Sequence, residues 1–197
     1  MARKLKIFLL LFSFSYGILA QKPFKQELWW SVWHPFAALK VKKIHKKVSI
    51  VYNANNTKLL LDGYTTGGRL DAFRHAFFMA AFAQKIKIKK LRKLGIAHEK
   101  GNYRQFLKRQ SENGELPDSL GSVMDLANNE LGFKIGSENK KKTLEELKGE
   151  VIKEINNGKA LVMKRANGSY VDCNNKIIDS LSYKGKWFVP KCLVPSK

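Results

Sequence analysis

The sequence predicts an α+β protein with a mainly helical N-terminal body and a small C-terminal antiparallel β hairpin or sheet. Two observations lead to this prediction. Apolar residues recur at helical spacing through most of residues 35–158, between helix-capping and helix-ending residues. Beyond that range the sequence changes to short β-rich runs such as SYVDC and KWFVPKCLV, separated by the turn signals ANGS and CNNK. We therefore expect a helical domain over residues 21–136, followed by a helix and a β-rich tail over residues 137–197.

The first 20 residues predict export. MARKLK is a basic segment, and the following apolar run, IFLLLFSFSYGIL, is too short to span a bilayer comfortably. Cleavage of this signal peptide is expected near Ala20, which would place the mature chain in the periplasm or the medium. An uncleaved N-terminal anchor is the alternative. No later segment of the sequence is apolar for long enough to be transmembrane.

The helical body is expected to begin with an aromatic cap, ELWWSVWHPF, because four aromatic residues and a proline lie so close together. Pro35 suits the first turn of a helix that runs through FAALKVKKIHKKVSIVY and ends at NANN. A second helix opens at GGRLDAFRHAFFMAAFAQ, with Asp71 near its N-terminus, where a negative charge suits the helix dipole. The basic segment KKLRKLG predicts its end, with Gly95 as the stop.

The next helices follow from similar signals. AHEKGNYRQFLKRQ predicts a separate helix, and Asp118 or Ser119 can cap the one after it, which Gly132 is expected to close. Thr143 and Glu146 form a T-x-x-E capping box, which starts an amphipathic helix that ends at Gly158. The lysine-rich stretch SENKKK is the best candidate for a linker between the helical body and the β tail.

Two cysteines stand in the β-rich tail, Cys173 and Cys192. An exported chain meets an oxidising compartment, so a disulfide between them is expected. The bridge would close a loop of about 20 residues and contribute roughly 3 kcal/mol to stability. Neither cysteine has the spacing of a zinc finger.

The formal charge of +21 favours an anionic partner, and loss of the three basic residues of the signal leaves +18. A phosphoester, an anionic lipid headgroup or an acidic glycan would fit this charge. Most of the positive charge is lysine in runs such as KVKKIHKK, which is typical of a solvated surface. Sequence-specific nucleic-acid binding is not expected, because base reading depends on arginine, asparagine and glutamine at a few places.

Polar residues inside three apolar segments define a candidate site. Asp71 and His75 are four residues apart, so they share one helix face. The segments AHE and MDLANNELG add further acids, imidazole and amides, and all of these groups meet if the helices pack together: His98, Glu99, Asp125, Asn128 and Asn129.

Such a cluster has the chemistry of a zinc or manganese site. Asp71, His75, His98 and Asp125 are the expected ligands, because imidazole and carboxylate groups bind both ions. Glu99 is the expected general base on a metal-bound water. Arg74 and Asn129 are expected to hold an anionic substrate, and Asn128 and Asn129 to orient the ligands.

A structural network is the alternative interpretation of the same residues. Asp71 then caps a helix, His75 is satisfied by Asp125, and Arg74 pairs with Glu99 or Glu130. The HExxH spacing of zinc proteases is absent, because KGN follows His98 and Glu99.

The ordered segments DAFRHA, AHE and MDLANNELG resemble a bacterial domain family of unknown function. Its members share a D-A-F-R-H-A helix, an H-E pair and an M-D-L-x-N-N-x-x-G segment, and the resemblance covers roughly residues 30–135. The resemblance implies a helical domain with a shared polar set and brings no activity. The sequence thus leaves two hypotheses: an exported metal-dependent hydrolase of an anionic, phosphoester-type substrate, or a non-catalytic envelope or polyanion-binding protein.

Overall fold

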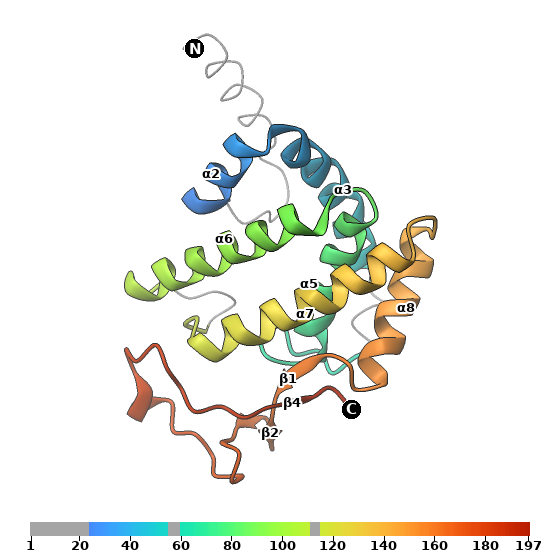
Figure 1. Ribbon diagram of the computed structural model, residues 1–197. Helices are drawn as coiled ribbons and strands as arrows, with labels where there is room; N and C mark the ends of the chain where they lie inside the picture. Colours follow the sequence, from blue (N-terminus) through green and yellow to red (C-terminus); the bar gives the residue numbers. More distant parts are fainter. Residues whose placement is uncertain (1–23, 55–59, 111–114) are drawn as a thin grey trace.

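The computed structural model describes residues 24–54, 60–110 and 115–197 and has the predicted α+β, mainly helical architecture (Figure 1). The expected signal peptide, residues 1–20, lies outside the described residues. The described part contains six α-helices: α2 (Lys25–Trp33), α3 (Pro35–Asn53), α5 (Arg69–Ala83), α6 (Ile88–Leu107), α7 (Ser119–Glu138) and α8 (Leu144–Asn156). Among these described helices, none is both long enough and apolar enough to cross a membrane.

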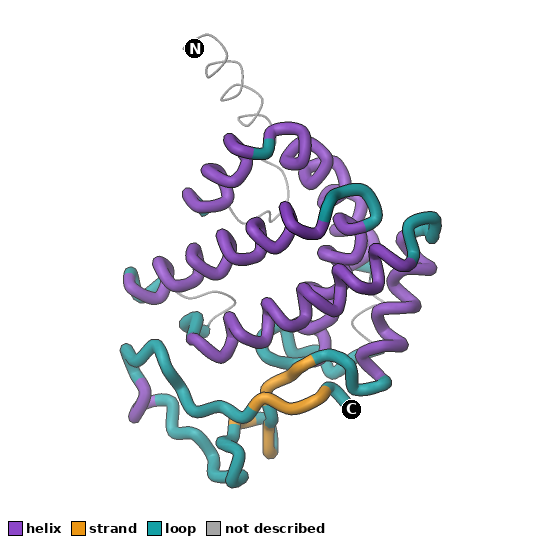
Figure 2. Tube along the Cα trace, viewed as in Figure 1, coloured by secondary structure: helices purple, strands orange, loops and turns teal. Residues whose placement is uncertain are grey.

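The C-terminal tail forms the expected small antiparallel pairs, which lie at one end of the helical body (Figure 2). β1 (Leu161–Met163) pairs with β4 (Leu193–Pro195), β2 (Arg165–Ala166) pairs with β3 (Ser169–Tyr170), and the 3-10 helix η1 (Leu181–Tyr183) lies between β3 and β4 in the sequence. The turn between β2 and β3 is the one that ANGS predicts. Asn167 and Gly168 both have positive φ, 48° and 81°, as a tight hairpin turn requires.

Helix α5 is the centre of the helical body. Eleven of its fifteen residues are buried, which is typical of a helix that other elements surround. It packs most extensively against α7 and also contacts α3, α6 and α8. Phe73 and Phe77 stack inside the main core, where Val48 of α3 and Leu147 of α8 join them.

Two glycines of α7 allow an unusually close approach to α5. A Cβ at Gly132 would lie closer than 3.0 Å to the carbonyl oxygen of Ala76, and one at Gly136 equally close to that of Ala80. The residue four positions further along α7 thus faces the residue four positions further along α5, so the two helices run in the same direction. The prediction that Gly132 ends its helix is wrong: the glycine stands at this crossing, and α7 continues to Glu138.

The expected helix stop at Gly95 is also wrong. Helix α5 ends at Ala83, and α6 runs from Ile88 through Gly95 to Leu107 as one helix. The break between α5 and α6 falls in QKIKIKK, a segment without the glycine or proline that usually indicates a helix end. Gly95 has a packing role instead, because a Cβ there would lie 3.0 Å from Nδ2 of Asn129 on α7.

The predicted caps are confirmed. The backbone N–H of Gly121 donates to the Asp118 carboxylate over 2.9 Å at the start of α7, and Thr143 and Glu146 form the capping box of α8. The link between α7 and α8 is held to the body, because the Gln84 side-chain amide donates to the backbone carbonyls of Asn139 and Lys142. Buried side chains of α8 belong to the same core as α5.

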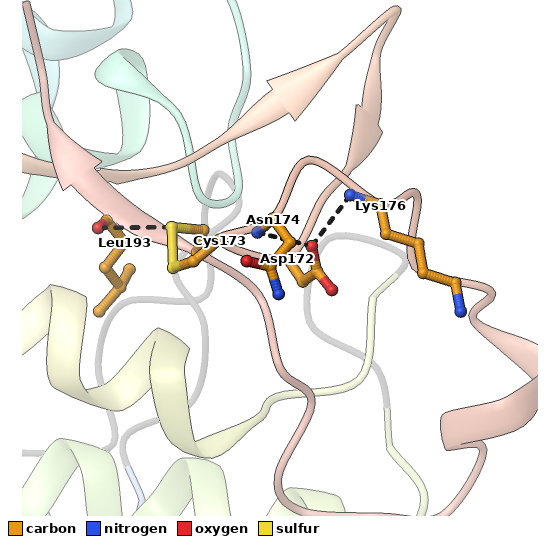
Figure 3. Close-up of a disulfide and its surroundings, with 6 residues drawn as sticks. Asp172, Cys173, Asn174, Lys176 and Leu193 are labelled. Atoms are coloured by element: carbon orange, nitrogen blue, oxygen red, sulfur yellow. Dashed lines mark hydrogen bonds between the residues drawn. A yellow bond between two sulfur atoms is a disulfide. The ribbon is translucent and has the colours of Figure 1, made fainter.

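Cys173 and Cys192 form a disulfide, with 4.8 Å between the two Cα atoms. It lies beside a loop in which the Asp172 carboxylate accepts the backbone N–H groups of Asn174 and Lys176 (Figure 3). The backbone of Cys192 also accepts from Lys164 and donates to Val171. The bridge thus ties the last segment of the chain to the hairpin.

Replacing both cysteines with serine should lower the free energy of unfolding by about 3 kcal/mol, because the unfolded chain regains the freedom of a loop of about 20 residues. Urea unfolding followed by circular dichroism measures this loss. Dithiothreitol should lower the stability of the natural chain to that of the double variant and leave the variant unchanged. Equal stability of the oxidised chain and the variant would contradict the prediction.

Candidate metal centre

The turn before α5 fixes Asp71 in the first turn of that helix. The Asp62 carboxylate caps α5 from upstream, because it accepts the backbone N–H groups of Arg69 and Leu70 at 2.6 and 3.1 Å. Gly67, at a φ of 70°, then turns its N–H toward Asp71 and donates to Oδ2 over 2.7 Å. A side chain at Gly67 would meet the Tyr170 hydroxyl, so this turn requires glycine.

Asp71, His75 and Asp125 form a buried group whose possible ligand atoms all lie within 4.8 Å of one another. Nε2 of His75 is 3.6 Å from Oδ1 of Asp71 and 3.3 Å from Oδ1 of Asp125. The first two residues share one face of α5, and the third comes from the parallel helix α7. Two carboxylates and one imidazole are a donor set that suits a divalent metal ion.

His75 is held in its neutral form. Burial lowers the pKa of its imidazole well below the usual value, and Arg74 and His98 lower it further, whereas contact with the Asn129 amide acts in the opposite direction. The Arg74 guanidinium lies 3.1 Å from Nε2, and because arginine only donates, Nε2 is the acceptor. The lone pair on Nε2 therefore points at the guanidinium, which a metal ion bound to this atom would have to displace.

Arg74 supplies the positive charge nearest to the two acids. Its Nη2 and Nε atoms donate to Oδ1 of Asp71 over 2.7 and 3.2 Å. Arg74 and a neutral imidazole thus surround two buried carboxylates, and a negative charge of this kind lowers the cost of placing a cation nearby. The Arg74 side chain is 29% exposed, so its guanidinium lies between the buried acids and solvent.

His98 and Glu99 lie on α6 and take other partners. Nδ1 of His98 is 2.9 Å from the Glu27 carboxylate of α2, and its ring centre is 6.5 Å from that of His75, so His98 stands beside the group of three. Glu99 is buried, and its Oε2 accepts from the Asn102 amide over 3.0 Å. Three of the four expected metal ligands thus converge.

The two asparagines of α7 have different surroundings. Asn128 is fully buried and makes two 2.9 Å hydrogen bonds, one to each backbone group of Leu161, so it fastens β1 to the helical body. Asn129 lies between His75 and Gly95. Of the two, Asn129 is the one placed to orient a ligand.

A cavity of about 50 Å³ opens beside the carboxylates of Asp71 and Asp125, and Arg74 also lines it. This volume holds a few water molecules. The sequence interpretation missed five of its polar lining residues: Thr66, Asn102, Glu115, Ser122 and Lys191. The sequence could have indicated Asn102, because this residue follows Glu99 by three positions on an otherwise apolar helix face. Lys191 pairs with Asp118 over 2.7 Å. It comes from the C-terminal tail, and no sequence pattern indicated that it would reach the cavity.

Comparison with known proteins gives a single finding. Residues 28–159 match the profile of a domain of unknown function, DUF6973. No curated protein and no solved structure gives a match. The matched segment runs from α2 to just beyond α8, so it includes the Asp–His–Asp group and leaves out the β-rich tail that supplies Lys191. Because the match spans well over half of the chain, the protein belongs to the DUF6973 family of domains of unknown function.

Proposed function

We propose that this protein binds one zinc or manganese ion through Asp71, His75 and Asp125 and hydrolyses an anionic, phosphoester-type substrate. The observation that carries the proposal is the convergence of two buried carboxylates and one neutral imidazole within 4.8 Å. Buried carboxylates are costly unless they are paired or bind a metal.

The residues around the cavity have separate roles in this proposal. A bound divalent ion would supply a water molecule acidic enough to ionise near neutral pH. Arg74 and Lys191 line the cavity and can hold the anionic oxygens of a substrate at its mouth. Glu99, the base expected from the sequence, does not line the cavity; it accepts a hydrogen bond from the Asn102 amide, which does, and so orients that amide. The small volume admits a few water molecules or substrate oxygens, and the rest of the substrate stays outside.

Metal titration tests the proposal. The purified, chelator-treated chain should bind one equivalent of Zn²⁺ or Mn²⁺ in a calorimetric titration, and its melting temperature should rise because the ion binds only the folded state. Less than one equivalent, with an unchanged melting temperature, would contradict the metal site. The metal-loaded chain should then hydrolyse a chromogenic phosphodiester. Metal binding without that activity would contradict the proposed hydrolase but support the proposed metal site.

The alternative is a non-catalytic envelope or polyanion-binding protein in which the polar residues form a structural network. The ion pair of Arg74 with Asp71 favours it, as do the two bonds of Asn128 to the backbone of Leu161. This alternative predicts no metal uptake. It also predicts that binding of a polyanion falls steeply with salt and is indifferent to His98→Ala.

We propose further that the chain is exported after cleavage near Ala20. The basic and apolar character of residues 1–20 supports this, although they lie outside the described residues. The disulfide supports it independently, because such bonds persist mainly in oxidising compartments.

A further inference from the structure

The corner between α2 and α3 exposes large apolar side chains. Trp29, Trp33 and Phe36 are 65%, 75% and 81% exposed. Trp29 and Trp33 share one face of α2, one helical turn apart. Trp33 and Phe36 are three residues apart across the corner, so their Cα atoms lie within about 11 Å of each other. Clustered exposed aromatic residues of this kind mark an interaction surface.

The apolar surface continues along the outer face of α3 among lysines. Phe36, Leu39 and Ile50 are exposed and recur at the spacing of a single helix face. Leu39 and Ile50 line one groove with lysine side chains between them, and five lysines surround this stripe: Lys40, Lys42, Lys43, Lys46 and Lys47. Between Pro35 and Asn53 the sequence has no Asp or Glu.

We infer that this aromatic–basic face, formed by Trp29, Trp33, Phe36, Leu39, Ile50 and the five lysines, docks the protein on an anionic lipid bilayer. Tryptophan and phenylalanine bury their rings at the boundary between headgroups and acyl chains. Lysine side chains cover apolar surface with their stems while their ammonium groups reach anionic headgroups. The face thus combines the two contributions that hold a protein on a membrane surface.

Charge decides between a bilayer and a second copy of the chain. Two such faces in contact would bring ten lysines together with no acid from either α3, and like charges oppose that contact. An anionic bilayer instead presents negative charge in a plane and an apolar layer behind it.

This inference is independent of the proposed metal site. The aromatic–basic face lies on α2 and α3, whereas the Asp–His–Asp group lies on α5 and α7. Figure 1 shows α2 and α3 at the opposite end of the molecule from the β strands that border the cavity. A variant that loses metal binding should therefore keep membrane docking, and a variant that loses membrane docking should keep metal binding.

Vesicle sedimentation tests the inference. The chain from Gln21 onward is suitable, because the buried residues of both core clusters lie between Trp30 and Ala160. It should sediment with vesicles of phosphatidylglycerol and phosphatidylcholine and not with phosphatidylcholine alone. Substitution of Lys43, Lys46 and Lys47 by serine should weaken the partition coefficient on the order of 100-fold, at about fivefold per lysine. The double variant Trp33→Ser, Phe36→Ser should weaken it at least tenfold.

Matched variants complete the design. Serine at Lys134, Lys140 and Lys141 removes the same charge from another exposed surface, and Leu181→Ser with Phe188→Ser removes exposed apolar side chains from the tail. Both controls should change vesicle binding less than threefold. Equal losses in face and control variants would overturn the inference. So would equally tight binding of a single-stranded oligonucleotide, or a dimer in solution that the face variants dissociate.

Discussion

Replacing Asp125 with asparagine should weaken zinc or manganese binding by at least about 100-fold. The substitution keeps the volume of the side chain and removes the charge of the only α7 carboxylate in the Asp71–His75–Asp125 group. Loss of residues that merely support metal ligands already costs about 10- to 100-fold in affinity, and loss of a ligand should cost no less. Calorimetric titration of the chelator-treated variant measures the change.

A control variant on α7 distinguishes the loss of a metal ligand from a general effect of removing a carboxylate from that helix. Glu130→Gln also converts a carboxylate of α7 to an amide, but Glu130 is half exposed and pairs with Arg92 on the surface. Its variant should bind the metal as the natural chain does. If Asp125→Asn bound the ion unchanged, or if both variants lost it equally, the assignment of Asp125 as a ligand would be wrong.

Replacing Gly136 with alanine should destabilise the fold by about 3 kcal/mol. The new methyl group would lie closer than 3.0 Å to the carbonyl oxygen of Ala80, and backbone atoms cannot turn aside as a flexible side chain can. The two helices must therefore separate along their closest contact. Thermal unfolding should show a melting temperature lower by roughly 10 °C.

Gly149 provides the matched control, because it also lies inside a helix but has nothing within 4 Å of the position that a Cβ would occupy. Gly149→Ala should raise stability by about 0.5–1 kcal/mol, since alanine loses less backbone freedom on folding. If Gly136→Ala were as stable as Gly149→Ala, the close crossing of α5 and α7 would not exist as described.

Gly132→Ala would affect the same crossing one helical turn nearer to the Asp71–His75–Asp125 group, opposite Ala76. Because Ala76 follows His75 directly, separation of the helices there would move Asp125 away from the imidazole. The crossing that holds the core together thus also sets the distance between the proposed ligands.

The starts of α3, α7 and α8 were predictable from the sequence, whereas the start of α6 at Ile88 and two helix ends were not. The signals that mark these starts are Pro35, Asp118 and the Thr143–Glu146 capping box. Each acts on backbone groups within one helical turn, so its effect can be predicted from the neighbouring residues alone. Gly95 and Gly132 read as stops because glycine commonly follows a helix. Here each glycine makes room for another helix, and nothing in the neighbouring residues distinguishes these two roles.

The candidate site divides in the same way. Asp71 and His75 were certain to share a face, since four residues along a helix bring side chains together wherever the helix lies. Whether His98 or Asp125 would reach them depended on the packing of α6 and α7. Glu27, which contacts His98, and Lys191, which lines the cavity, are distant in sequence and gave no sign of these contacts.

The sequence by itself determined the α+β class, the caps, the disulfide and the chemistry of the polar residues, because each of these depends on residue type and on short spacing along the chain. Only the tertiary structure decided which polar groups meet, that the tail borders the cavity, and which aromatic residues remain exposed on α2 and α3. The physical reason is that these outcomes depend on distances between helices. Such distances are set by close contacts such as that of Gly132 with Ala76, which bring together residues far apart in the sequence.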